Sequence, residues 1–126
     1  MKKIHQTSNA PAAIGPYSQA VEVDGWVFCS GQIPLDAQTG EVIEGGAKEQ
    51  TQKIMENIGA VLKASDLNYA NVIKTTIFLS DMSHFQTVNE VYGAYFKENP
   101  PARSTVAVKG LPKNVDVEVE VIARRF

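Results

Sequence analysis

The stretch Pro100–Glu120, PPARSTVAVKGLPKNVDVEVE, decides the fold because it contains one strand, a tight connection and most of a second strand. Its last part alternates valine with acidic residues from Val115 to Ala123, which is the period of a strand with one buried face and one polar face. Gly110 and Pro112 separate this strand from an earlier one at Ser104–Val108.

Upstream of this stretch the periodicity changes twice. Apolar residues recur at three- and four-residue spacing within Ala47–Ala64 and predict a helix of four to five turns. Val72–Ser80 is rich in β-branched and aromatic residues, which is typical of a central strand. Ser83 with Gln86 forms a capping-box pattern for a second helix, expected to continue to Asn99.

The N-terminal part predicts a hairpin. Residues 1–18 contain prolines and a glycine and are expected to form a loop or an edge strand. Gln19–Val23 and Trp26–Ser30 then flank Asp24-Gly25, a two-residue turn signal between alternating apolar runs. The second strand is expected to run into Gly31, and Ile33-Pro34 is expected to stop its regular pairing.

The order of elements is therefore hairpin, helix, strand, helix, strand, strand. It predicts one α+β domain spanning residues 1–126, with two helices packed on one face of a single sheet. The strands are apolar on both faces, as the alternation of Trp26 and Phe28 with Val27 and Cys29 shows. An uncovered apolar face favours burial against identical copies, so we expect a homo-oligomer.

Composition excludes several classes of protein. The chain has 126 residues, 44% of them hydrophobic and 21% charged, with a net charge of −2. The N-terminus lacks the apolar segment of a secretory signal and no run is long enough to span a membrane, so a cytoplasmic protein is expected. Basic residues form no stripe for nucleic acid. One cysteine and two distant histidines predict neither a disulfide nor a metal site.

Arg103 is the first candidate for a functional residue. A guanidinium presents a planar fork of donors that matches a carboxylate, and the prolines just before Arg103 fix where its side chain begins. The alternative is a surface arginine in an ion pair.

The acidic face of the last strand is the second candidate. A carboxylate at Glu118 or Glu120 could hold or activate a water molecule. Alternatively, Asp116, Glu118 and Glu120 form the solvated face of an antiparallel strand. Acids within about 7 Å of one another repel unless a cation or a water network lies among them. Arg103 or a shared site could supply that partner.

Three residues lie where regular structure is expected to break: Tyr17, Ser30 and Gly31. Loop positions on a rigid scaffold often carry function, although a packed tyrosine, a strand end and a bulge glycine would explain them equally. Cys29 is expected to be an inert core residue, and Ser30 has no histidine nearby in sequence to activate it.

Several motifs together resemble the Rid family, also called the YjgF family. Its C-terminal signature is similar to PARSTVAVKGLPKNVDVEVE, and the segments APAAIGPYSQ (10–19), SGQIP (30–34), KTTIFL (74–79) and VNEVY (88–92) agree with it in the same order. The resemblance covers nearly the whole chain and lies closest to the RidA subgroup of 2-iminobutanoate/2-iminopropanoate deaminases.

The resemblance implies a fold and an activity. The expected fold is the chorismate-mutase-like (bacillus-type) α+β fold with one mixed sheet, assembled as a homotrimer whose clefts lie between subunits. The expected reaction is hydrolysis of reactive enamines and imines: 2-aminoacrylate/2-iminopropanoate to pyruvate, and 2-iminobutanoate to 2-oxobutanoate, each with release of ammonia. No cofactor or metal is implied.

The resemblance also implies roles for individual residues. Arg103 would bind the substrate carboxylate, Glu118 would position the water, and Tyr17 would complete the catalytic group. Cleft-lining positions match Ser30, Gly31, Asn89 and Thr105. Many members carry cysteine where this chain has Thr105; we expect that position to act through its backbone, because imine hydrolysis needs no covalent nucleophile.

Two other functions are compatible with the resemblance. The chain could be a non-catalytic, ligand-sensing or regulatory protein that uses the same cleft, and Thr105 leaves room for that role. Some family members are described as RNA-cleaving translation inhibitors, but the acidic charge balance and the lack of a basic stripe count against RNA here.

Overall fold

The structure is a computed structural model that describes residues 1–126. Six strands, two α-helices and three short 3-10 helices follow one another along the chain. In order they are β1 (Lys3–His5), β2 (Ala20–Val23), β3 (Trp26–Gln32), α1 (Ala47–Ala64), η1 (Tyr69–Asn71), β4 (Val72–Leu79), η2 (Met82–His84), α2 (Phe85–Gly93), β5 (Ala102–Ala107), η3 (Pro112–Asn114) and β6 (Val117–Arg124).

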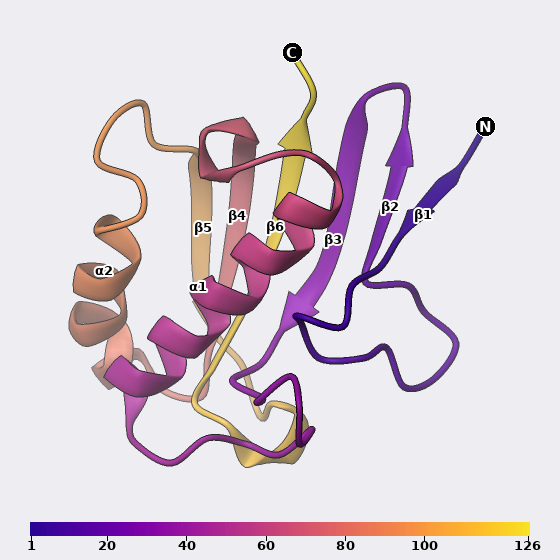
Figure 1. Cartoon of the computed structure of the whole chain (residues 1–126). Coiled ribbons are helices and arrows are strands. Elements are labelled where there is room, and N and C mark those ends of the chain that lie inside the picture. Colours follow the sequence, from indigo (N-terminus) through magenta and orange to yellow (C-terminus); the bar gives the residue numbers. More distant parts are fainter.

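All six strands form one mixed sheet in the order β1-β2-β3-β6-β4-β5. The β4–β5 pair is parallel, because α2 intervenes between these strands, and every other pair is antiparallel. Figure 1 shows both helices on the same side of this sheet, with α1 crossing β4 and β6. The predicted α+β architecture, with two helices on one face of a single mixed sheet, is therefore confirmed.

The first helix has the predicted bounds, whereas the second differs in both of its ends. Asp81, and not Ser83, caps the turn before α2: its carboxylate accepts a hydrogen bond of 2.8 Å from the Ser83 amide. The helix ends at Gly93, so Tyr95 and Phe96 lie in the following loop. The apolar period continued past the helix because these aromatic side chains still pack on the core.

The hairpin is confirmed, with Asp24 (φ 52°) and Gly25 (φ 81°) both in the left-handed conformation that its two-residue turn requires. The edge strand expected within residues 1–18 is β1. The expected loss of pairing at Ile33-Pro34 is confirmed, because β3 continues through a register shift after Cys29 and ends at Gln32. That bulge re-aims the backbone at Ser30 and Gly31.

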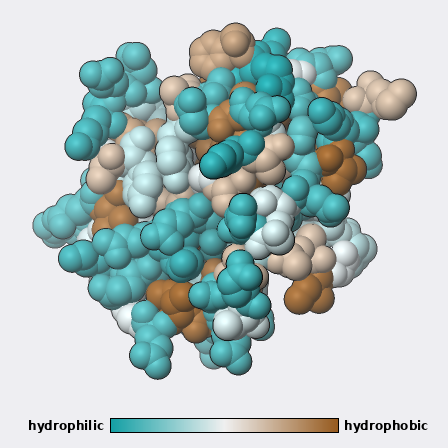
Figure 2. All heavy atoms as spheres, viewed as in Figure 1, coloured by the Kyte–Doolittle hydropathy of each residue, from teal (hydrophilic) through white to brown (hydrophobic).

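The two faces of the sheet differ in what covers them. The helix-side face is buried, as the uniformly buried residues Val117, Val119 and Val121 of β6 show. On the opposite face Trp26, Phe28 and Val106 remain 42%, 47% and 44% exposed. Figure 2, viewed from the helix side, shows a mainly hydrophilic surface there. The apolar exposure expected from sequence therefore lies on the sheet's open face.

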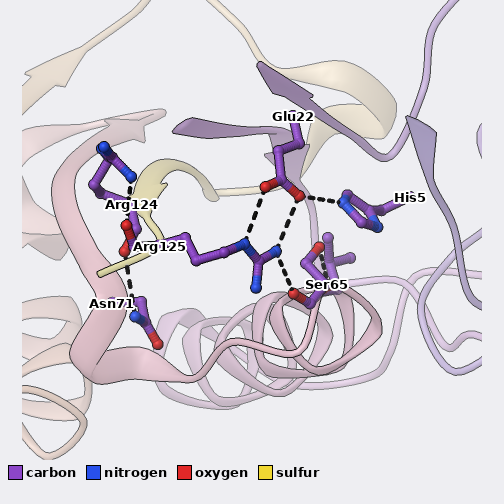
Figure 3. Close-up of polar contacts among 7 residues, drawn as sticks. His5, Glu22, Ser65, Asn71, Arg124 and Arg125 are labelled. Atoms are coloured by element: carbon purple, nitrogen blue, oxygen red, sulfur yellow. Dashed lines mark hydrogen bonds and ion pairs between the residues drawn. The ribbon is translucent and has the colours of Figure 1, made fainter. Parts of the chain in front are cut away.

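A polar cluster joins the two ends of the chain (Figure 3). The Arg125 guanidinium donates two hydrogen bonds to the Glu22 carboxylate, at 3.0 and 2.9 Å, and a third of 2.8 Å to the carbonyl of Ser65. His5 Nε2 lies 2.8 Å from the same carboxylate. This cluster, which we name the terminal clamp, connects β1, β2, the end of α1 and the residue after β6.

Neither helix has the length and apolarity needed to cross a membrane.

Candidate active site

An open cleft of about 700 Å³ lies beside the end of β3 and the start of β6. Five of the residues predicted from sequence line it: Tyr17, Ser30, Gly31, Glu118 and Glu120. Apolar side chains of Ile14, Ile33 and Leu35 form part of the wall. Residues far apart in the sequence are thus brought together at one place, as a binding site requires.

The β3 bulge builds one wall of the cleft. The Ser30 amide donates to the carbonyl of Gln19 at 2.9 Å, and its hydroxyl donates to the carbonyl of Ser18 at 2.5 Å. Ser30 therefore uses its hydroxyl proton to hold the segment that follows Tyr17. Tyr17 itself is 54% exposed at the mouth of the cleft, where its hydroxyl is available to a ligand.

Glu118 lies directly against the backbone of Gly31. A Cβ atom added to Gly31 would overlap the Oε2 atom of Glu118, so only glycine leaves room for this carboxylate. Burial raises the pKa of Glu118 above its ordinary value, and the neighbouring charge of Glu120 raises it further. A carboxyl group in this environment takes up a proton more readily than an exposed glutamate, which suits it to proton exchange with a bound water.

The acidic face of β6 has a different set of partners from those expected. Asp116 accepts a hydrogen bond of 2.8 Å from the Ser80 hydroxyl and lies 3.6 Å from His84 Nε2. Arg103 of the same chain is not among the acids, so the prediction that it could be their cation is wrong within one chain. Arg103 pairs with the buried Thr75 of β4 and therefore lies on the helix-covered face, whereas Glu118 pairs with Phe78 on the other face.

Arg103 is held on the helix side by residues of α2. Its Nη1 donates a hydrogen bond of 2.6 Å to Oδ1 of Asn89. Its guanidinium carbon lies 5.6 Å from the centre of the Phe85 ring and 5.2 Å from that of Tyr92. The side chain is exposed, so the donors that Asn89 does not use remain free for an anion.

Thr105 lies two residues further along β5, on the same face as Arg103. Its hydroxyl oxygen is buried and has no hydrogen-bond partner. In the β4–β5 pair, Thr105 lies opposite Ile77 and Arg103 lies opposite Thr75. The predicted site residues therefore form two groups: one in the cleft around Glu118, and one around Arg103, Asn89 and Thr105.

Sequence reasoning missed several residues of the cleft, among them Lys113 and Gln19. Lys113 lines the cleft from the connection before β6. Its backbone is left-handed (φ 55°), which no pattern in the sequence predicts. Gln19 is buried, and its amide nitrogen donates to the Pro11 carbonyl at 2.7 Å while its oxygen accepts from the Thr7 amide at 2.7 Å. A glutamine at the start of an otherwise apolar strand was the available signal for this role.

The residues present do not form a metal site or a thiol nucleophile. No group of three or more histidine, cysteine, aspartate or glutamate side chains is placed to hold an ion. Burial raises the pKa of Cys29 to about 12, so its thiol is protonated at neutral pH and inert, as predicted.

Residues 7–125 match the family model described as Endoribonuclease L-PSP, which represents the Rid family. The chain belongs to the Rid family. The family predicted from sequence motifs is thereby confirmed, and the match extends across both groups of candidate residues.

Rid proteins similar to this chain carry several different descriptions. The mouse protein named 2-iminobutanoate/2-iminopropanoate deaminase is 46% identical over 123 residues, covering 98% of this chain and 91% of its own. A Thermotoga maritima structure described as a candidate endoribonuclease has a TM-score of 0.97 and 49% identity, covering 100% of this chain and 99% of its own. E. coli TdcF, solved with bound serine, has a TM-score of 0.93 and 43% identity, covering 98% and 99%.

Proposed function

We propose that this Rid protein hydrolyses small 2-imino acids, with their enamine tautomers, to 2-oxo acids and ammonia. The observation that carries the proposal is the carboxylate of Glu118, which is half-buried in the cleft against Gly31 and has a raised pKa. The name of the mouse relative supports the choice of reaction. The serine bound to TdcF supports the choice of ligand, because serine carries a carboxylate next to a nitrogen-bearing carbon.

The proposed reaction needs one positioned water, both of whose protons end on the nitrogen. Glu118 accepts a proton from water as the water oxygen bonds to the imine carbon, and it passes that proton to the nitrogen, which gives a carbinolamine. The carboxylate, ionised again, then takes the remaining hydroxyl proton as the carbonyl forms and delivers it to the nitrogen as the C–N bond breaks. The sum is imine plus water to 2-oxo acid plus ammonia, and Glu118 ends as it began.

In this proposal Arg103 binds the substrate carboxylate through its free donors, with Asn89 fixing one end of the guanidinium. Tyr17, Ser30, Gly31 and Thr105 complete the walls, the last through its backbone. An imine is already electrophilic, so orientation of the substrate and of one water accounts for the catalysis required. None of these steps uses a cofactor.

The proposal requires more than one copy of the chain. Arg103 faces the helices, whereas Glu118 faces the opposite side of the same sheet. A substrate of three or four carbon atoms cannot contact both groups through the sheet. We therefore propose that a homotrimer forms through the open apolar face and places Arg103 of one copy opposite Glu118 of another.

The test is a coupled assay in which a dehydratase generates 2-aminoacrylate and the loss of the imine signal is followed. We expect wild-type protein to accelerate the loss, and Arg103→Ala to raise KM at least tenfold by removing the carboxylate contact. Absence of acceleration by wild-type protein would exclude the enzyme. Binding of a 2-oxo acid without turnover would instead select the ligand-sensing alternative.

A further inference from the structure

Three residues of α2 contact Arg103, and they lie on one stripe of the helix. Phe85, Asn89 and Tyr92 are spaced i, i+4 and i+7, so their side chains point the same way. Asn89 fixes one nitrogen of the guanidinium, while the two rings lie beneath its charged carbon. The stripe therefore constrains the guanidinium on more than one side.

Tyr92 differs from the other two because it is also fixed to the sheet. It is buried, and its hydroxyl lies 2.7 Å from Oγ1 of Thr75, which is itself fully buried. Thr75 is the strand partner of Arg103 in the parallel β4–β5 pair. The hydroxyl of Tyr92 is thus bonded to the residue directly beside Arg103, and its ring returns beneath the guanidinium of Arg103.

A second aromatic contact holds the ring from behind. The ring of Phe96 lies 4.9 Å from that of Tyr92, tilted by 47°, and Phe96 is buried in the core. With its hydroxyl bonded and its ring packed, Tyr92 has no freedom to rotate away from Arg103. A cation over a fixed aromatic ring is attracted to it, and the attraction strengthens where water is partly excluded.

We propose that Tyr92 is a positioning residue for the carboxylate-binding Arg103. It holds the guanidinium plane in a fixed place before the ligand arrives, so that binding does not require an arginine side chain to be ordered from solvent. This inference rests on the proposed role of Arg103. It adds a residue that does not touch the ligand and acts through Arg103 alone.

The test measures binding of 2-oxobutanoate by calorimetry to the wild-type protein and five variants. We expect Tyr92→Leu to weaken affinity about three- to tenfold, because the cation–π contact is lost and the guanidinium becomes mobile. Tyr92→Phe keeps the ring and its packing on Phe96 but loses the hydroxyl bond to Thr75, so its affinity should lie between those of wild type and Tyr92→Leu. The matched control Tyr95→Leu removes a neighbouring ring that packs on Tyr69 and not on Arg103, and should leave affinity unchanged.

The double variant Tyr92→Leu/Arg103→Ala separates positioning from general structural damage. If Tyr92 acts through Arg103, its replacement costs no further affinity once Arg103 is absent. An equal loss in both backgrounds, or no loss in folded Tyr92→Leu, would overturn the inference. In turnover, Tyr92→Leu should raise KM and leave kcat nearly unchanged, because the contact is the same in substrate and transition state.

The Arg103→Ala arm tests the proposed function separately. If that variant binds 2-oxobutanoate as well as wild type, the role of Arg103 fails and the inference about Tyr92 falls with it. Should Tyr92→Leu not fold, nuclear magnetic resonance of the wild-type protein decides the matter. We expect ring-current shifts on the side-chain protons of Arg103 that persist when ligand is added, and their absence would overturn the inference.

Discussion

The position of the Glu118 carboxylate depends on the absence of a Cβ atom at Gly31. The carboxylate occupies the space that a side chain at residue 31 would fill. The alternation of β6 placed Glu118 on the polar face from sequence alone. Nothing in the sequence pattern showed that this acid meets Gly31, because the β3 bulge that brings them together is a tertiary feature.

We predict that Gly31→Ala abolishes most of the proposed activity while the protein remains folded. The backbone at residue 31 is not in the left-handed region, so alanine adds no backbone strain, but its Cβ displaces the flexible end of Glu118. We expect kcat to fall about a hundredfold, comparable with loss of a general base. Gly110→Ala, which meets no atom, is the control. Near wild-type kcat in folded Gly31→Ala would contradict the assigned place of Glu118.

A second residue-scale prediction concerns pH. Glu118 must be ionised to accept a proton from water, and its raised pKa moves the acidic limb of the kcat/KM profile above the ordinary glutamate value of 4.5. In Glu120→Gln the repelling charge is gone, so the pKa of Glu118 falls and the limb shifts to lower pH. Stopped-flow rates across the acidic range, corrected for spontaneous hydrolysis, measure the acidic limb of wild type and that of Glu120→Gln. An unchanged limb in the variant would show that the two acids are not coupled.

Elements differ in how far their sequence specified them. Helix α1 has the predicted bounds because its apolar stripe, its start and its end agree with one another. Helix α2 does not, because Asp81 caps the 3-10 helix η2 and α2 begins only at Phe85, without a side-chain cap. The aromatic stripe also continues in the loop beyond Gly93. Local patterns fix an element when every signal agrees, and mislead when packing continues past the hydrogen-bonded helix.

The terminal clamp joins four elements and gives a prediction at this scale. Hydrogen bonds from Arg125 and then His5 lower the pKa of Glu22 from 4.5 to about 2. A lowered pKa contributes stability that is fully present above pH 4.5 and is lost as the pH falls through about 2. Stability of this protein should therefore depend on pH through Glu22 in that acidic window.

We expect Glu22→Gln to lower the free energy of unfolding at pH 7 by about 1–2 kcal/mol, a range reduced because Arg125 is partly exposed. Urea unfolding at several pH values measures it, with the exposed Glu41→Gln as the control. The difference between wild type and variant should shrink from pH 4.5 towards pH 2. A difference that stays constant over that range would contradict the clamp's ionic character.

At the scale of the whole molecule, the sheet separates the candidate residues. Arg103 and Glu118 lie on opposite faces, and the face that carries Glu118 also exposes Trp26 and Phe28. Exposed apolar side chains in register on one face are expected to be buried against another copy. The proposed trimer would therefore both cover this face and complete the site.

This arrangement predicts that two inactive variants restore activity when they are mixed. Neither Arg103→Ala nor Glu118→Gln alone has a complete cleft, but a mixed trimer contains clefts with both residues intact. Random reassembly of equal amounts should recover about a quarter of the wild-type clefts. The imine assay after joint refolding measures the recovery, and separately refolded variants mixed afterwards are the control. No recovery from co-refolded chains would show that both residues act within one chain.

The sequence by itself determined the element types, the α+β class, the apolar nature of both sheet faces and the family. These follow from local periodicity and from motifs read in order, which need no knowledge of distant contacts. Only the tertiary structure showed that Gly31 borders Glu118 and that Lys113 and Gln19 belong to the cleft. It alone also showed that the Arg103 guanidinium lies over the Tyr92 ring on the helix side of the sheet. Strand register and the β3 bulge decide these contacts, because a side chain's partners depend on which strands lie beside it and which face it occupies.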